Sequence, residues 1–176
     1  MKLAFIGLGA IGKPMSDRLN DNGYDLNLYK RDKLKSGDQK KYFIDPIEAV
    51  RDCDGLLICV TDDNSVESVL FGKNGVADSL KPNSFVIDFS TISPKKSISI
   101  HKRLVKKNIF YVDCPVSGGT EGAHKGTLSL FIGASKKECL SFEHIFEVLG
   151  QSINYFNGVG KGCLLYTSDA ADDGLS

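Results

Sequence analysis

The sequence predicts an α/β fold of the Rossmann type, a doubly wound and mostly parallel sheet with helices on both faces. Strand-like apolar runs alternate with segments of helical periodicity, which is the rhythm of βαβ units. Runs such as residues 56–60 are apolar at every position, and this indicates burial on both faces of the sheet. A glycine-rich turn at residues 7–12 follows the first run directly, as it does where such sheets bind dinucleotides.

The expected strands are short runs rich in aliphatic and aromatic residues. They lie at residues 3–6, 26–29, 56–60, 85–89 and 110–112. Two later runs, residues 128–132 and 153–156, are expected to be further strands of the same sheet.

Helices are expected between these runs. Asp45 and Ser93 each precede a proline and are expected as N-caps, because proline suits the first helical turn. The predicted helices cover residues 11–22, 46–52, 64–71, 94–107 and 136–149.

Composition limits the class of protein. With 176 residues, of which 41% are hydrophobic and 25% charged, the chain suits one globular domain with one apolar core. Lys and Arg total 22, as do Asp and Glu, so no overall field would attract nucleic acid or an anionic membrane. No apolar run approaches the roughly 18 residues of a membrane span. The glycine motif begins too early to leave room for a signal peptide, and we expect a cytoplasmic protein.

Cysteine and histidine residues give no metal or disulfide pattern. No pair of cysteines has C-x-x-C spacing, so we expect buried reduced thiols at Cys53, Cys59, Cys114, Cys139 and Cys163. No metal site is expected at the scattered histidines, which are His101, His124 and His144.

Each glycine of the motif has a distinct expected role in binding a pyrophosphate. Gly7 lets the chain turn tightly off the strand, Gly9 lets the backbone approach phosphate oxygens, and Gly12 lets the helix pack close to the strand. Backbone N–H groups at the helix start would face the anion. A glycine triad alone is weak evidence, and an ordinary glycine-rich turn is the alternative.

The residues after the second strand bear on the choice between NAD and NADP. About 18 residues after Gly12, where a dinucleotide-binding sheet contacts the adenosine ribose, the chain has Lys30 and Arg31. Two cations suit a 2′-phosphate, so the pattern favours NADP, and NAD stays possible because Asp32 follows. The alternative is a solvated basic turn.

Polar residues follow the next strands, at the edge where parallel sheets bind ligands. Thr61 and Thr91 are expected near the ribose and nicotinamide of the coenzyme, although each could simply cap a helix. The Ser-Gly-Gly turn of Ser117, Gly118 and Gly119 can direct consecutive N–H groups at a substrate carboxylate. A flexible hairpin connection is the alternative there.

The last residues differ in character from the rest of the chain. From Cys163 they read Cys-Leu-Leu-Tyr-Thr-Ser-Asp-Ala-Ala-Asp-Asp, with neither strand alternation nor a helix face. This string equals the translation of TGTCTCTTATACACATCT followed by GACGCTGCCGACGA, a widely used sequencing adapter. We therefore predict a dinucleotide-binding domain at residues 1–162 and a non-native tail at residues 163–176, the alternative being a genuine polar tail.

Four ordered blocks carry a family resemblance. They are residues 5–15 (FIGLGAIGKPM), 69–76 (VLFGKNGV), 88–94 (DFSTISP) and 113–133 (DCPVSGGTEGAHKGTLSLFIG). Together they resemble the β-hydroxyacid dehydrogenase family, which includes 3-hydroxyisobutyrate dehydrogenase, tartronate semialdehyde reductase and glyoxylate/succinic semialdehyde reductases. The resemblance extends from Met1 to about Gly162 and is much more specific than a glycine triad.

The resemblance implies an NAD(P)-dependent oxidoreductase that transfers hydride between the coenzyme and a small 3-hydroxy acid or its semialdehyde. A small carboxylate substrate is implied at Ser117, Gly118 and Gly119. The implied coenzyme contacts are Gly7, Leu8, Gly9, Ala10, Ile11, Gly12, Lys30, Arg31, Val60, Thr61, Ser65 and Thr91.

The family's catalytic lysine has no counterpart in this sequence. In the family it lies on a helix just beyond a glycine-rich run, which corresponds here to residues 158–162. Its expected place is about Tyr166, and Lys161 lies in the loop before it. The family's all-helical C-terminal domain, through which its members form homo-oligomers, does not appear in the sequence either. We therefore expect this chain to bind the coenzyme with little catalysis.

Two other functions fit part of the pattern. A 6-phosphogluconate dehydrogenase or an imine reductase shares the sheet and the glycine turn, but the match around Ser117 argues against an imine reductase. A non-catalytic dinucleotide-binding interaction module would explain the missing lysine at Tyr166.

Overall fold

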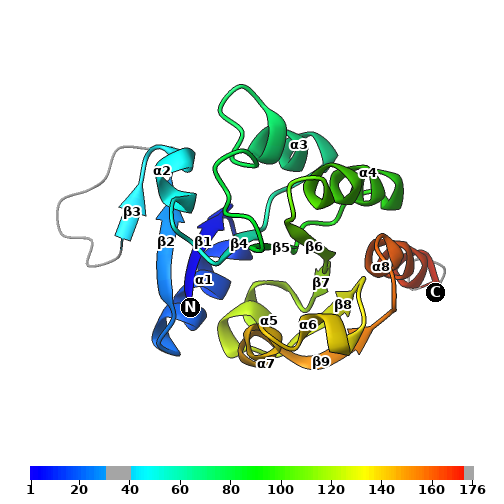
Figure 1. The fold of residues 1–176 in the computed structure, drawn as a ribbon. Helices are drawn as coiled ribbons and strands as arrows, with labels where there is room; N and C mark the ends of the chain where they lie inside the picture. The colour runs from blue at the N-terminus through cyan, green and yellow to red at the C-terminus, as the bar shows by residue number, and fades with distance from the viewer. Residues whose placement is uncertain (31–40, 173–176) are drawn as a thin grey trace.

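A computed structural model of the chain describes residues 1–30 and 41–172, with side chains up to residue 166. Its main sheet is six-stranded and parallel throughout, in the order β3-β2-β1-β4-β5-β6 (Figure 1). The strands are β1 (Lys2–Ile6), β2 (Asp25–Tyr29), β3 (Lys41–Phe43), β4 (Gly55–Ile58), β5 (Phe85–Asp88) and β6 (Phe110–Asp113). This is the strand order of the Rossmann fold, so the predicted fold class is confirmed.

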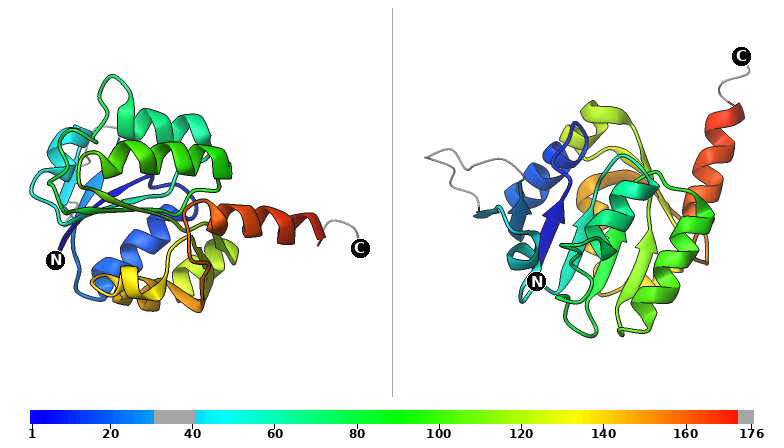
Figure 2. Two further views of the ribbon diagram at one scale, coloured as in Figure 1. Left: turned by 45° about the vertical axis from the view of Figure 1, so that its right-hand side comes forward. Right: turned by 90° about the horizontal axis from the view of Figure 1, so that it is seen from above.

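Helices cover both faces of the sheet (Figure 2). One face carries α1 (Gly12–Asp21), α5 (Gly119–Lys125) and α7 (Glu143–Leu149), and the other carries α2 (Pro46–Val50), α3 (Asp63–Phe71) and α4 (Pro94–Val105). Successive residues of β1 point to opposite faces, Leu3 and Phe5 toward α1, Ala4 and Ile6 toward α3. The sheet therefore separates two apolar cores, where the sequence analysis expected one.

The prediction that residues 128–132 and 153–156 join the main sheet is wrong. They belong to a second, three-stranded sheet formed by β7 (Val116–Ser117), β8 (Leu128–Ile132) and β9 (Gly150–Tyr155). β8 is antiparallel to β7 and parallel to β9. In β8 every second residue is fully buried, whereas β4 is buried throughout. This alternation is typical of a strand with one covered face, and it distinguishes β8 from the central strands.

The predicted helix at residues 136–149 is two helices, α6 (Lys136–Cys139) and α7. The chain breaks between them because Phe142 turns inward and stacks on Phe85, with ring centroids 4.3 Å apart. The predicted N-caps are confirmed: the Ile47 amide donates to the Asp45 carboxylate at 2.9 Å, and the Lys96 amide donates to the Ser93 hydroxyl at 3.3 Å. Short elements β3, β7 and α5 were not predicted.

The final described element is α8 (Lys161–Asp172), a helix that projects from the body of the domain (Figure 2). The sequence analysis expected no helix from Cys163 onward, and that expectation is wrong for residues 163–172. Lys161, expected in the preceding loop, is the first residue of the helix. Cys163 in its first turn is fully buried. The helical conformation does not bear on the origin of residues 163–176, which stays a prediction.

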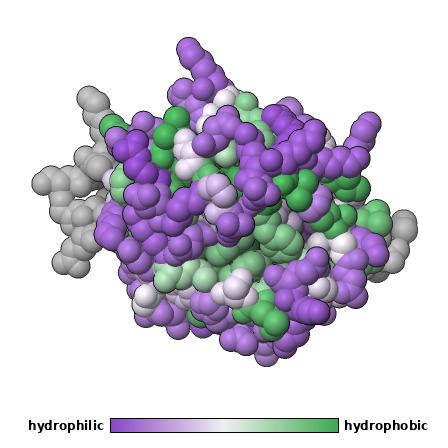
Figure 3. Space-filling model, viewed as in Figure 1, coloured by the Kyte–Doolittle hydropathy of each residue, from purple (hydrophilic) through white to green (hydrophobic). Residues whose placement is uncertain are grey.

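No disulfide joins the cysteines of the described residues, and all except the half-buried Cys59 are buried, as predicted for reduced thiols. In the described residues, no helix has both the length and the apolar character needed to cross a membrane. Polar side chains cover most of the molecular face in Figure 3. Within the same residues, no cluster of three or more His, Cys, Asp or Glu side chains could hold a metal ion.

Leu57 at the centre of β4 tests the core that α1 covers, because its side chain is fully buried there. The substitution Leu57→Ala should lower the free energy of unfolding by about 3 kcal/mol, through lost apolar burial and the cavity it leaves. Leu140→Ala, at a side chain that is 61% exposed, should cost less than about 0.5 kcal/mol. Urea unfolding measures both values, and similar losses in the two variants would contradict the assignment.

Candidate functional site

The glycine turn brings backbone atoms of β1, α1 and β4 into contact. Gly7 has a φ of +105°, and a Cβ atom on it would lie 2.0 Å from the carbonyl oxygen of Cys59. A Cβ on Gly12 would lie 1.9 Å from the Gly7 carbonyl oxygen. A Cβ on Gly9 would meet nothing within 4 Å. Gly7 and Gly12 therefore have the turning and packing roles that the sequence predicts, and Gly9 leaves open space in front of the turn.

The start of α1 presents unused hydrogen-bond donors. The Lys13 amide donates to the Gly9 carbonyl at 3.0 Å, and no side chain caps the helix at Ile11. In the part of the chain that the structure describes, the amides of Gly9, Ala10 and Ile11 donate to no protein acceptor. Free N–H groups at a helix N-terminus carry partial positive charge, so this turn is suited to bind an anion.

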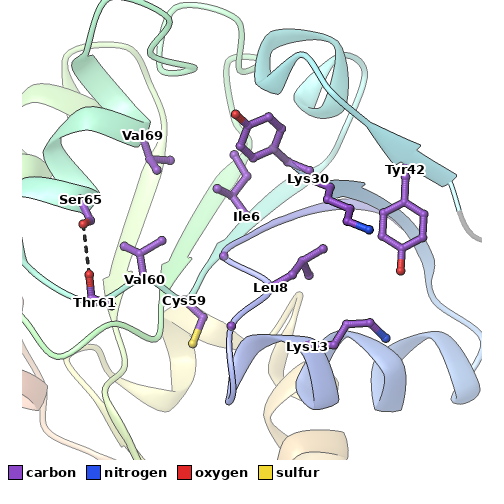
Figure 4. A pocket seen from close by; sticks show the side chains of 13 residues that line it. Ile6, Leu8, Lys13, Lys30, Tyr42, Cys59, Val60, Thr61, Ser65 and Val69 are labelled. Carbon is purple, nitrogen blue, oxygen red and sulfur yellow. Dashed lines mark hydrogen bonds between the residues drawn. The ribbon is translucent and has the colours of Figure 1, made fainter. Parts of the chain in front are cut away.

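A pocket of about 540 Å³ opens next to the glycine turn, between β2 and β3 on one side and α3 on the other (Figure 4). Several residues predicted to bind the coenzyme line it together: Gly7, Leu8, Gly9, Lys30, Val60, Thr61 and Ser65. The sequence analysis missed the remaining lining residues, which are Ile6, Lys13, Tyr29, Tyr42, Cys59 and Val69.

The α3 wall of the pocket is held by a network of short hydrogen bonds. Asp62 caps α3, since the Ser65 amide donates to its carboxylate at 2.8 Å, and this bond lowers the pKa of Asp62. The Thr61 and Ser65 hydroxyls lie 3.2 Å apart and point toward one another (Figure 4), and both residues line the pocket. The Val60 amide donates to the Ser90 hydroxyl at 3.0 Å. Thr61 therefore has its hydroxyl at the pocket and does not cap the helix.

The pocket has a positive lining. Among the described residues, none that lines the pocket is acidic, whereas Lys13 and Lys30 both contribute to it. Lys13 is paired with Asp17 at 2.6 Å. The Lys30 ammonium lies 5.7 Å from the centroid of the Tyr42 ring, within the range of a cation–π interaction (Figure 4). Arg31 and Asp32, the neighbours on which the NADP prediction also rests, lie outside the described residues.

Other predicted site residues are not part of the lining of this pocket. Ala10, Ile11, Gly12 and Thr91 are not among its lining residues. The expected substrate turn, Ser117, Gly118 and Gly119, is exposed and leads directly into α5. Its two glycines have φ values of +125° and +62°, so the turn needs glycine there, and α5 replaces the alternative of a flexible hairpin.

Two further residues bear on the chemistry of the site: Cys59, which lines the pocket, and Tyr166, at the place of the expected lysine. Burial raises the pKa of the Cys59 thiol to about 12, so this pocket residue is a neutral thiol and a poor nucleophile. Tyr166, at the place of the expected lysine, packs edge-on against Phe131 with ring centroids 5.7 Å apart.

Comparison with known proteins identifies the family. Residues 2–159 match the NAD binding domain of 6-phosphogluconate dehydrogenase. The chain belongs to this family of NAD-binding domains. The match covers the whole main sheet and both sides of the pocket.

Relatives and solved structures support the same assignment. The 2-hydroxy-3-oxopropionate reductase of Escherichia coli (strain K12) is 34% identical over 167 residues, which covers 92% of this chain and 56% of that enzyme. The mitochondrial 3-hydroxyisobutyrate dehydrogenase of Mus musculus is 31% identical over 166 residues, covering 91% of this chain and 49% of the mouse enzyme. A solved structure of Psf3 in complex with NADP+ and 2-OPP has a TM-score of 0.87 and 26% identity, over 95% of this chain and 61% of that chain.

These findings confirm the predicted resemblance to the β-hydroxyacid dehydrogenases. The chain spans about half the length of the curated relatives it matches. It is thus an NAD(P)-binding domain of an oxidoreductase family, with a pocket at the carboxyl edge of its parallel sheet.

The glycines of the turn should respond differently to the same added methyl group. Gly7→Ala should lower the free energy of unfolding by more than about 2 kcal/mol, because the residue has a positive φ and no room beside Cys59. Gly9→Ala should cost less than about 1 kcal/mol, because its Cβ meets open space. Thermal or urea unfolding gives both values, and equal losses would show that the close contact at Gly7 is not a constraint.

Proposed function

We propose that this chain is the NADP-binding domain of an oxidoreductase that interconverts a small 3-hydroxy acid and its semialdehyde. The observation that carries the proposal is the glycine turn, in which the N–H groups of Gly9, Ala10 and Ile11 are unused and Gly9 lines a pocket whose described residues include lysines and no carboxylates. Such a lining suits a ligand that carries several phosphates. NAD is the second coenzyme that the same turn would hold.

The coenzyme would lie across the carboxyl edge of the sheet. Its pyrophosphate would accept hydrogen bonds at the glycine turn, and its adenosine ribose would lie toward Lys30 at the end of β2. Tyr42 and the apolar face of Leu8 would flank the ribose. When bound, the nicotinamide supplies or accepts the hydride. Val60, Thr61 and Ser65 would then form the wall opposite Lys30.

Substrate would be held apart from the coenzyme phosphates. Consecutive amides at Ser117, Gly118 and Gly119 form an exposed turn at which a carboxylate could accept several hydrogen bonds. Thr91 at the end of β5 would approach the nicotinamide ribose. We propose a small carboxylate of the glyoxylate, succinic semialdehyde or tartronate semialdehyde type. The names of the E. coli and mouse relatives support this class of substrate.

Proton transfer limits the proposed activity of the chain. Arrival of hydride at a carbonyl carbon builds negative charge on the oxygen, which an ammonium group stabilises and protonates. Tyr166 stands where the family resemblance expects that ammonium group, and its ring packs on Phe131. We therefore propose that the chain binds coenzyme but turns over slowly. Tyr166 also favours a second candidate function, a non-catalytic dinucleotide-binding module.

The cellular location and the oligomeric state of the protein are proposals as well. We propose a cytoplasmic protein whose complete form assembles as a homo-oligomer through a C-terminal helical domain. The greater length of the relatives supports the further domain, because this chain covers 56% of the E. coli enzyme.

Lys30 tests the choice of coenzyme. Lys30→Met should weaken NADP binding about tenfold, because a charge-assisted contact to the 2′-phosphate is lost, and should leave NAD binding within about twofold. The control is Lys41→Met, which removes an exposed ammonium group of β3 that pairs with Asp25 at 2.6 Å outside the pocket. Calorimetric titration measures both affinities. Equal loss of NAD and NADP binding would overturn the phosphate role of Lys30, and no binding of either coenzyme to the unaltered chain would overturn the proposed function.

Turnover separates the enzyme from the non-catalytic module. Residues 1–176 with saturating NADPH and glyoxylate or succinic semialdehyde should consume NADPH no faster than a protein-free control. The complete open reading frame, with a lysine at the place of Tyr166, should give measurable turnover because it supplies the proton donor. A clear rate from residues 1–176 would contradict the need for that lysine. A complete gene product without turnover would favour the module.

A further inference from the structure

Two buried carboxylates end neighbouring strands behind the pocket. Asp88 closes β5 and Asp113 closes β6, and the two residues are partners in the parallel register. Both side chains are fully buried. No salt bridge of the described residues involves either of them. Two buried carboxylates without a cation are costly to the fold, so their hydrogen-bond partners indicate what they do.

Asp88 is joined to the pocket wall through Ser90. One carboxylate oxygen of Asp88 accepts the Ser90 amide at 3.0 Å, and the other accepts the Tyr111 hydroxyl at 3.1 Å. The Ser90 side chain also hydrogen-bonds Asp88. The same Ser90 hydroxyl accepts the Val60 amide at 3.0 Å, and Val60 lines the pocket. A continuous path of hydrogen bonds therefore runs from the buried carboxylate to the wall.

Asp113 has a different set of partners. Its two carboxylate oxygens accept the Gly160 amide at 2.8 Å and the Cys163 amide at 3.1 Å. Both donors lie at the start of α8, so Asp113 orients that helix. Among the described residues, the hydrogen bonds of Asp113 do not lead to the pocket wall. The two carboxylates are thus matched in burial and strand position but differ in what they hold.

We propose that Asp88 is a positioning residue for the coenzyme pocket: its ionised carboxylate orients Ser90, and the Ser90 hydroxyl fixes the Val60 amide and the wall behind the coenzyme. This inference rests on the proposed coenzyme binding. A charged acceptor forms hydrogen bonds roughly twice as strong as a neutral one. Loss of the charge therefore loosens the wall without removing any residue from it.

The groups around Asp88 set the pH at which its carboxylate loses its charge. Burial raises the pKa of Asp88 to about 6, against the lowering effect of the bonds from Ser90 and Tyr111, and the Asp113 charge raises it further. The other titratable groups around it are neutral near pH 6, because burial raises the pKa of each: Tyr111, Cys59, Cys114 and Cys163. Helix α4, packed against β6, buries Ser97, Ile100 and Leu104, none of them charged.

Removal of the Asp88 charge should weaken coenzyme binding without lowering the stability of the fold. A carboxyl group whose folded pKa lies above its ordinary value of 3.8 destabilises the fold once the pH rises through about 6. Asp88→Asn removes that charge, so its melting temperature at about pH 8 should be equal to or above that of the unaltered chain. Its coenzyme affinity should fall, because a neutral amide orients Ser90 more weakly. A merely structural role would lower both.

The experiment is calorimetric titration of residues 1–176 with NADP, at about pH 8 and about pH 5, with a melting temperature for each sample. The 2′-phosphate itself titrates near pH 6, so the quantity compared at each pH is the ratio of Kd for Asp88→Asn to Kd for the unaltered chain. We expect a ratio of about three to ten at the higher pH and about one at the lower pH, where Asp88 is already protonated.

Asp113→Asn is the matched control. It should keep the NADP affinity of the unaltered chain at about pH 8. It should also move the pH midpoint of binding downward, because the neighbouring charge that raises the pKa of Asp88 is removed. A fall in affinity equal to that of Asp88→Asn would overturn the proposal, since any buried carboxylate would then have the same effect.

Ser90 provides a test that does not depend on the folding of the Asp88 variant. Ser90→Ala should weaken NADP binding about three- to tenfold, and Ser90→Thr, which restores the hydroxyl, should recover it. Failure of Ser90→Ala to weaken binding would overturn the proposal while the proposed function stands. An unaltered chain that binds neither NADP nor NAD would overturn both.

Discussion

The site depends on a close approach of backbone atoms that is possible only because Gly7 and Gly12 have no side chain. Gly7 lies against the Cys59 carbonyl, and Gly12 lies against the Gly7 carbonyl, so the end of β1, the end of β4 and the start of α1 meet at one point. In the turn between these contacts, the amides of Gly9, Ala10 and Ile11 donate to no acceptor among the described residues. Because β1 pairs with β2 on one side and β4 on the other, Lys30 and Val60 flank the turn as a consequence of strand order. The anion site is therefore a property of the topology more than of any one side chain.

Charge at the pocket is arranged locally in a chain with no net charge. Two described carboxylates near the pocket are engaged with other groups: Asp17 pairs with Lys13, and Asp62 accepts the Ser65 amide at the start of α3. Neither lines the pocket, whereas the Lys30 ammonium does. A field of one sign can thus form at a small site without the basic surface that would attract nucleic acid. Local pairing therefore lets a protein without net charge present a positive pocket lining.

The parts of the fold that could be predicted are those with strong local signals. The strands that are buried on both faces and the glycine turn were found because apolar runs and glycine spacing are visible in the sequence itself. Tyr42 was missed because β3 is three residues long and has no periodicity to detect. The helix break before α7 depends on Phe142 meeting Phe85, a contact distant in sequence. The second sheet, in contrast, could have been recognised, since Ser129 and Phe131 alternate with buried residues in β8.

The proposed coenzyme pocket and the proposed place of the proton donor lie in different parts of the chain. The described residues that line the pocket all precede Leu70, whereas position 166 is on α8. The orientation of α8 is set before that place is reached, because Asp113 binds the amides of Gly160 and Cys163 in its first turn. Position 166 follows Cys163 by about one helical turn, or roughly 5 Å along the axis. The contacts of Asp113 therefore fix the start of the helix on which the proposed proton donor would lie, independently of the residue at position 166.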